Sequence, residues 1–124
     1  MVENVDFIMI AGSEVPVWCD LYVLNEIQEE YGTIGKFERA LVGISEDEKG
    51  KVINKEPDLK TLMFALRIMV QEGIKKQKKA GIETDIDVEQ VLMDADIPYT
   101  ELADMLHDVF RRCFRAKKIN QERE

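Results

Sequence analysis

The sequence contains one histidine, His107, and two carboxylates stand close to it in a segment with helical spacing, Asp104 and Asp108. An imidazole and carboxylates could supply ligands to a metal ion such as Zn²⁺. One histidine beside two helical carboxylates is also a common arrangement on protein surfaces, so we predict no metal there. A Ser-His or Cys-His pair assembled by folding would be a catalytic alternative, but no sequence motif supports one.

Residues 45–56, with the sequence SEDEKGKVINKE, have part of the pattern of an EF-hand calcium loop. Gly50 and Glu56 fall at positions six and twelve, where such a loop has its glycine and its bidentate glutamate. Lys49 falls at position five, where a carboxylate is needed, so the segment should bind Ca²⁺ poorly. The Gly-Lys pair in GTIGKFE lacks the spacing and the hydroxyl of a phosphate-binding loop. We therefore predict neither a calcium site nor a phosphate-binding loop in these two stretches.

The charge of the chain argues against general binding to nucleic acid. The formal net charge is −8, from 17 basic and 25 acidic residues. Two stretches without an acid, Lys75–Lys79 and Arg111–Lys118, hold nine of the basic residues. We interpret both stretches as helix ends, where cations interact favourably with the helix dipole. The alternative is that they form a dedicated binding patch.

Composition and apolar runs predict a cytoplasmic protein without a membrane segment. With 45% hydrophobic and 34% charged residues, 124 residues suit a single soluble domain. No apolar run approaches the ~20 residues that cross a bilayer, and MVENVDF lacks the basic region of a secretory signal. Cys19 and Cys113 stand far apart without a CxxC motif. We expect two free thiols, with a disulfide as the alternative.

Local patterns predict an α+β fold that is mostly α-helical, with a short N-terminal β-hairpin followed by about five helices. Apolar runs at 7–10 and 15–18 surround a glycine turn, and Pro16 indicates that the second strand is an edge. Asp20 should cap a helix whose apolar face holds Leu21, Leu24, Ile27 and Tyr31. Gly32 should end that helix.

The remaining elements follow from similar signals. Thr33 begins a short helix that ends at Gly43, and residues 44–57 form a long loop with room for a small hairpin. Residues 58–74 form a helix that is apolar nearly all round, including Leu59 and Met63. Asp87 and Gln90 suggest a capping box, and a last helix starts after residue 98. We predict one domain, 1–118, and a disordered tail, 119–124.

This order of elements, over residues 5–116, resembles the tail assembly chaperones of long-tailed bacteriophages, as found in prophages of Gram-positive bacteria. The resemblance rests on two stretches of residues. The first has Leu24, Glu26, Ile27, Glu30, Tyr31 and Gly32, and the second has Asp58, Leu59, Leu62 and Leu66. The resemblance implies a non-enzymatic protein of the bacterial host cytoplasm that self-associates, needs no cofactor and coats the tape measure protein during tail assembly.

The last helix is the predicted client-binding site. Phe110 and Phe114 lie four residues apart on one face, and Arg111, Arg112 and Arg115 border them. Aromatic anchors surrounded by arginine are typical of interface hot spots. The alternative function is a small helical regulatory or adaptor protein that binds a protein or nucleic acid through its basic helix ends. A small enzyme is the third hypothesis.

Overall fold

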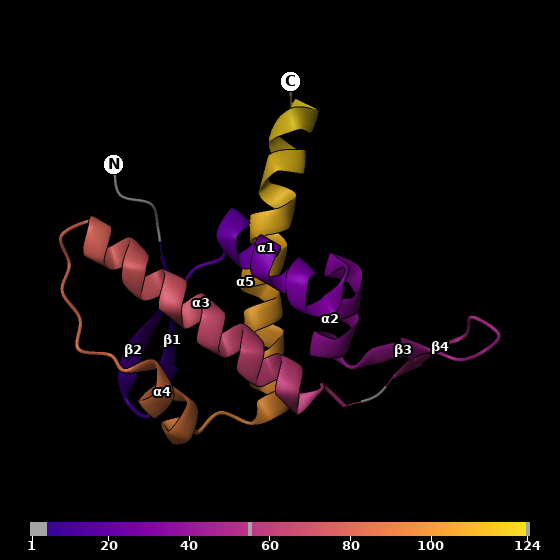
Figure 1. Cartoon of the computed structure of the whole chain (residues 1–124), viewed down its shortest axis with the longest axis horizontal. Helices are drawn as coiled ribbons and strands as arrows, with labels where there is room; N and C mark the ends of the chain where they lie inside the picture. Colours follow the sequence, from indigo (N-terminus) through magenta and orange to yellow (C-terminus); the bar gives the residue numbers. More distant parts are fainter. Residues whose placement is uncertain (1–4, 55, 124) are drawn as a thin grey trace.

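This computed structural model describes residues 5–54 and 56–123, and for Glu46, Asn54 and residues 114–123 it describes the backbone without the side chain. The described chain confirms an α+β fold in which helices dominate. Its elements are β1 (Asp6–Ile10), β2 (Ser13–Val17), α1 (Leu21–Tyr31), α2 (Ile34–Val42), β3 (Ile44–Glu46), β4 (Val52–Asn54), α3 (Leu59–Lys79), α4 (Val88–Asp94) and α5 (Tyr99–Arg123). The long helices α3 and α5 cross near the middle of the molecule, and the β3–β4 hairpin extends away to one side (Figure 1).

Strands β1 and β2 are joined by a two-residue turn, Ala11-Gly12. Both residues have positive φ, 51° and 83°, as a type I′ turn requires. In such a hairpin the residues that flank the turn, Ile10 and Ser13, form a hydrogen-bonded pair, and bonded and non-bonded pairs then alternate. Pro16 therefore falls at a non-bonded position, where β1 does not need the N–H that proline lacks.

The side of β2 that faces away from β1 packs directly on α3. The N–H of Trp18 donates a hydrogen bond to the carbonyl of Met69 over 3.0 Å. At Gly73 the helix approaches so closely that a Cβ there would lie 2.6 Å from the carbonyl carbon and oxygen of Pro16. Because Pro16 has no N–H, no backbone donor is buried without a partner at this contact. Pro16 thus lies on an edge strand, as predicted, but α3 covers that edge.

A chain of aromatic rings links four helices in the core. Phe37 of α2 makes edge-to-face contacts with Tyr31 of α1 at 5.5 Å, with Phe64 of α3 at 6.3 Å and with Phe110 of α5 at 5.4 Å between ring centroids. Edge-to-face pairs add stabilisation to the area that they bury. Phe37 and Phe110 are fully buried, as are Val15, Val17, Val23, Ile27, Leu41, Met69, Val70 and Leu106.

Two predictions of buried faces are wrong in part. On α1 the fully buried residues are Val23 and Ile27, whereas Leu21 is 71% exposed. The buried face follows the i, i+4 pair that meets the core, and Leu21, in the first turn, lies outside it. On α3 the predicted stripe is buried at Leu62, Leu66, Met69 and Val70, but Leu59 and Met63 are 58% and 47% exposed. The beginning of α3 therefore presents apolar side chains on the surface.

The helix caps confirm most of the local chemistry. The side chains of Asp20, Thr33 and Asp58 each accept a hydrogen bond from a backbone N–H three residues later. The capping box predicted at α4 does not close. Asp87 accepts from the N–H of Glu89, while the Gln90 amide donates to Asp94 over 2.9 Å.

Helix α5 continues further than predicted. The sequence predicted a disordered tail from residue 119, but the backbone is helical through Arg123. Alanine, lysine, glutamine, glutamate and arginine predominate there, and all favour helix, so the helix propagates past its last core residues. Among the described helices, none combines the length and hydropathy needed to cross a membrane.

Candidate functional site

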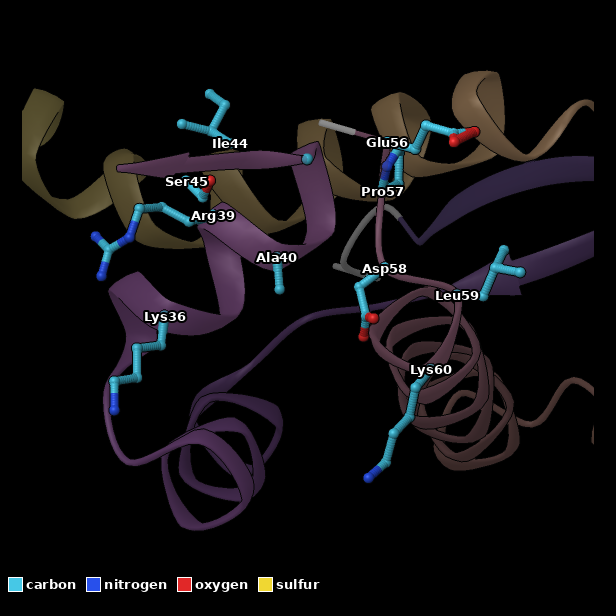
Figure 2. A pocket seen from close by; sticks show the side chains of 11 residues that line it. Lys36, Arg39, Ala40, Ile44, Ser45, Glu56, Pro57, Asp58, Leu59 and Lys60 are labelled. Carbon is cyan, nitrogen blue, oxygen red and sulfur yellow. The ribbon is translucent and has the colours of Figure 1, made fainter. Parts of the chain in front are cut away.

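A cleft of about 780 Å³ lies at the base of the β3–β4 hairpin (Figure 2). One wall comes from α2 and the beginning of β3, and the other comes from residues 56–60, which lead into α3. These segments are separated in sequence, so the cleft exists only in the folded chain.

Local hydrogen bonds hold the two walls together. Helix α2 ends at Gly43, whose left-handed φ of 79° turns the chain directly into β3. The N–H of Asp58 donates to the carbonyl of Ala40 over 3.0 Å. The Asp58 carboxylate accepts from the N–H of Thr61 at 3.0 Å and from its hydroxyl at 2.7 Å. Asp58 therefore caps α3 and at the same time fixes that helix to α2.

The cleft carries an excess of positive charge although the chain is acidic. Lys36, Arg39 and Lys60 line it, and none of them has an ion pair among the side chains that the structure describes. Figure 2 shows Lys36 and Lys60 extending toward the same side. Of the two lining carboxylates, Asp58 is engaged in its cap, and Glu56 accepts a hydrogen bond from the Tyr99 hydroxyl.

The side chains that line the cleft can bind charged and apolar groups. The lining has no histidine or cysteine, and its carboxylates already have partners. The hydrogen bond to Glu56 raises the pKa of Tyr99, so this hydroxyl remains a donor and not a base. Exposed lysine and arginine beside apolar Ile44 and Leu59 can instead bind a surface that carries carboxylates and apolar side chains.

The β3–β4 hairpin forms a short arm above the cleft and confirms the small hairpin predicted around Gly50. The Asp47 carboxylate accepts from the N–H groups of Lys49 and Lys51, at 2.9 and 2.8 Å, so it shapes the turn of the arm. Apolar side chains remain in contact with solvent along the arm: Val52 is 59%, Ile53 38% and Ile44 36% exposed.

The predicted client site on α5 needs correction. Phe110 is fully buried against Phe37 and is therefore a core residue, not a surface anchor. Arg111 is exposed, and Arg112 is engaged by carboxylates at its guanidinium. The side chains of Phe114 and Arg115 lie outside the described residues. Among the members of the set whose side chains the structure describes, Arg111 and Arg112 lie on the surface.

Other residues singled out by the sequence interact with side chains of the same chain. His107 is paired with Glu38 over 2.8 Å between Nε2 and Oε2, and within the described residues no group of three metal-ligating side chains occurs. In the stretch Lys75–Lys79, Lys75 Nζ lies 5.1 Å from the ring centroid of Tyr22, and Lys76 Nζ lies 4.7 Å from that of Trp18. These lysines make cation–π contacts within the chain.

Sequence reasoning missed the three cations of the cleft. Lys36, Arg39 and Lys60 belong to two helices and to no charge run, so no local signal marks them. Comparisons with protein-family models, with curated proteins and with solved structures found no match.

Proposed function

We propose that this protein is a non-enzymatic assembly chaperone that binds a long helical client, of the kind that the tape measure protein represents in phage tails. It would act in the cytoplasm of a bacterial host, without a cofactor and as a homo-oligomer. Two observations support the proposal and a third bears on its alternative.

The β3–β4 arm carries the proposal. It has only three residues in each strand, and an isolated two-stranded hairpin is marginal in water. Packing of the exposed Val52 and Ile53 against another chain would be favourable, because it would remove apolar surface from water. An arm of this kind is expected in a protein whose task is to hold a partner.

The cleft beside the arm supports the same role. Lys36, Arg39 and Lys60 can pair with acidic residues of a client, while Leu59 and Ile44 contact its apolar stripe. A helical client that alternates acidic and apolar faces would fit both the arm and the cleft.

The alternative, a regulatory or adaptor protein that binds nucleic acid through basic helix ends, has less support. Lys75 and Lys76 already contact aromatic rings, and Lys75 also pairs with Glu72 at 3.2 Å. These contacts use part of the positive charge that a phosphate backbone would need.

The test is co-expression with the large coiled-coil protein encoded nearest to this gene. We expect the chaperone to co-purify with that client and to keep it soluble. The double variant Val52→Asp/Ile53→Asp should lose binding, because it puts charges where apolar contact is needed. Leu21→Asp is the matched control, since Leu21 is an even more exposed apolar side chain but lies on α1.

Two outcomes would contradict the proposal. One is an arm variant that binds the client as well as the wild type does. The other is a wild-type protein that neither binds the client nor suppresses its aggregation. Light scattering over a wide concentration range tests self-association separately, and a monomer throughout would remove that part of the proposal.

A further inference from the structure

The fold brings the two cysteines of the sequence together. Cys19 follows β2 and is 7% exposed, whereas Cys113 is partly buried on α5 and packs against the same core. The Cys113 thiol lies close enough to that of Cys19 to raise the pKa of Cys19. Neither cysteine is in a disulfide in this structure, in agreement with the sequence prediction.

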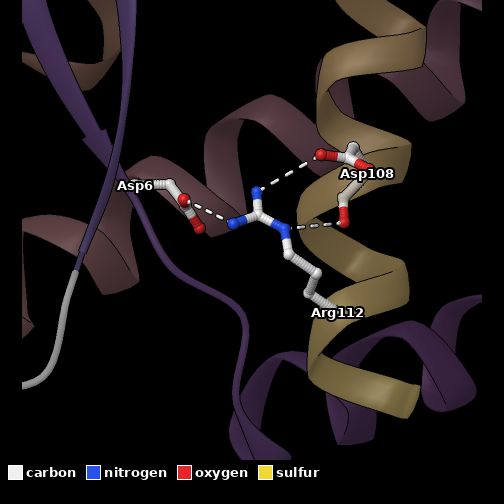
Figure 3. Close-up of polar contacts among 3 residues, drawn as sticks. All are labelled: Asp6, Asp108 and Arg112. Atoms are coloured by element: carbon white, nitrogen blue, oxygen red, sulfur yellow. Dashed lines mark hydrogen bonds and ion pairs between the residues drawn. The ribbon is translucent and has the colours of Figure 1, made fainter. Parts of the chain in front are cut away.

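A neighbouring ion pair independently places this turn of α5 beside the end of the hairpin. One guanidinium nitrogen of Arg112 lies 2.8 Å from the Asp6 carboxylate, and the other lies 3.5 Å from Asp108 (Figure 3). Asp6 is paired in register with Val17. Cys19 comes two residues after Val17, and Cys113 comes directly after Arg112. The ion pair and the two cysteines therefore belong to the same contact between the β1–β2 hairpin and α5.

We propose that Cys19 and Cys113 form a reversible oxidation site, at which a small-molecule disulfide such as oxidised glutathione closes an intramolecular disulfide between the hairpin and α5. The site needs no residue beyond these two cysteines, because the fold already holds the resolving thiol beside the attacking one.

The reaction is thiol–disulfide exchange in two steps. The thiolate of Cys113, the more accessible residue, attacks one sulfur of glutathione disulfide. The S–S bond of glutathione breaks, and the departing glutathione takes up the proton that Cys113 lost. The thiolate of Cys19 then attacks the Cys113 sulfur and displaces the second glutathione, which takes up the proton of Cys19. Two protein thiols are oxidised, and one glutathione disulfide is reduced to two thiols.

The surroundings of Cys19 make the second step slow at neutral pH. In the reduced protein the hydrogen bond with Cys113 and burial both raise the pKa of the Cys19 thiol. Burial still acts once Cys113 carries glutathione, and only the thiolate is nucleophilic. Ring closure should therefore accelerate by close to tenfold for each pH unit between about 7 and 9. The site then responds to sustained oxidation and not to a brief pulse.

The test exposes the full-length protein to oxidised glutathione at pH 8.5, then blocks remaining thiols and measures the intact mass. We expect a monomer that has lost two hydrogens, has no alkylated cysteine and yields a cross-linked peptide containing both residues. Its Tm should rise by on the order of 10 °C, because the bond closes a long loop. Dithiothreitol should reverse both changes.

Single variants separate the two steps. Cys19→Ala should stop at the mixed disulfide on Cys113, and Cys113→Ser should leave Cys19 largely unreacted. The wild-type result does not depend on these variants, so it decides the matter even if one of them folds poorly. Wild type that stops at a glutathione adduct, keeps two alkylatable thiols or forms only intermolecular dimers would overturn the proposal.

Discussion

Replacing Gly73 with alanine should destabilise the fold, although alanine is the better helix former. In the interior of a helix alanine is favoured over glycine by about 1 kcal/mol. Here the new Cβ would lie 2.6 Å from the carbonyl atoms of Pro16 and 2.8 Å from the nitrogen of Val17. Backbone atoms cannot swing aside as the end of a side chain can, so the hairpin must move.

The expected loss in the free energy of unfolding follows from three contributions. Overpacking of a tight contact costs about 1–3 kcal/mol. Displacing the hairpin also strains the hydrogen bond from Trp18 to Met69, which contributes about 1 kcal/mol. Subtracting the gain in helix propensity leaves a net loss of about 2 kcal/mol for Gly73→Ala.

Urea denaturation followed by circular dichroism measures this loss. With m-values of about 1–3 kcal/mol/M, the midpoint should fall by about 1 M. Gly35→Ala is the matched control, because its Cβ would meet only the flexible end of Arg39, at 3.3 Å. The control should be neutral or more stable. If Gly73→Ala is as stable as the wild type, the close approach of β2 to α3 is refuted.

Two further substitutions test the turn and a buried carboxylate. Ala11→Asn should stabilise by about 0.5–1 kcal/mol, because asparagine adopts positive φ more readily at this turn position; a fall in Tm would contradict the turn assignment. Burial raises the pKa of Glu72, although Lys75 lies 3.2 Å away. Such a carboxyl favours folding below its ordinary pKa of 4.5, and this contribution is lost as the pH rises through the folded-state pKa. Glu72→Gln should therefore match or exceed wild-type stability at pH 8 and depend less on pH above 4.5, as urea titrations at several pH values would show. A variant that is less stable at pH 8 would mean that the Lys75 pair outweighs burial.

The elements that sequence predicted well depend on residues within three or four positions of one another. The caps at Asp20, Thr33 and Asp58 each use one side chain and a nearby N–H. The hairpin turn needs only Gly12 and its neighbour. Such signals carry their physical cause within the local sequence, so the order of the elements and the starts of α1, α2 and α3 followed from them.

Features that depend on packing between elements could not be predicted in the same way. Phe110 belongs to an apolar stripe that would look the same whether the core or a partner covered it, and Phe37 is what buries it. Whether Leu21 or Val23 faces the core depends on how α1 is rotated against its neighbours, and the local sequence does not determine that rotation. Lys36 and Lys60 line the same cleft because α2 and α3 are joined at Asp58, which no charge run indicates.

The hairpin β1–β2 can reach its full stability only late in synthesis. Alone, two strands are marginal in water. The segment of α3 that covers β2 at Gly73 follows Pro16 by roughly sixty residues, which a ribosome adds in about 3–11 s. Through that interval Ile8 and Ile10, which are buried in the finished fold, remain open to solvent and to neighbouring nascent chains. The first strands of this protein are therefore its most aggregation-prone part while it is being made.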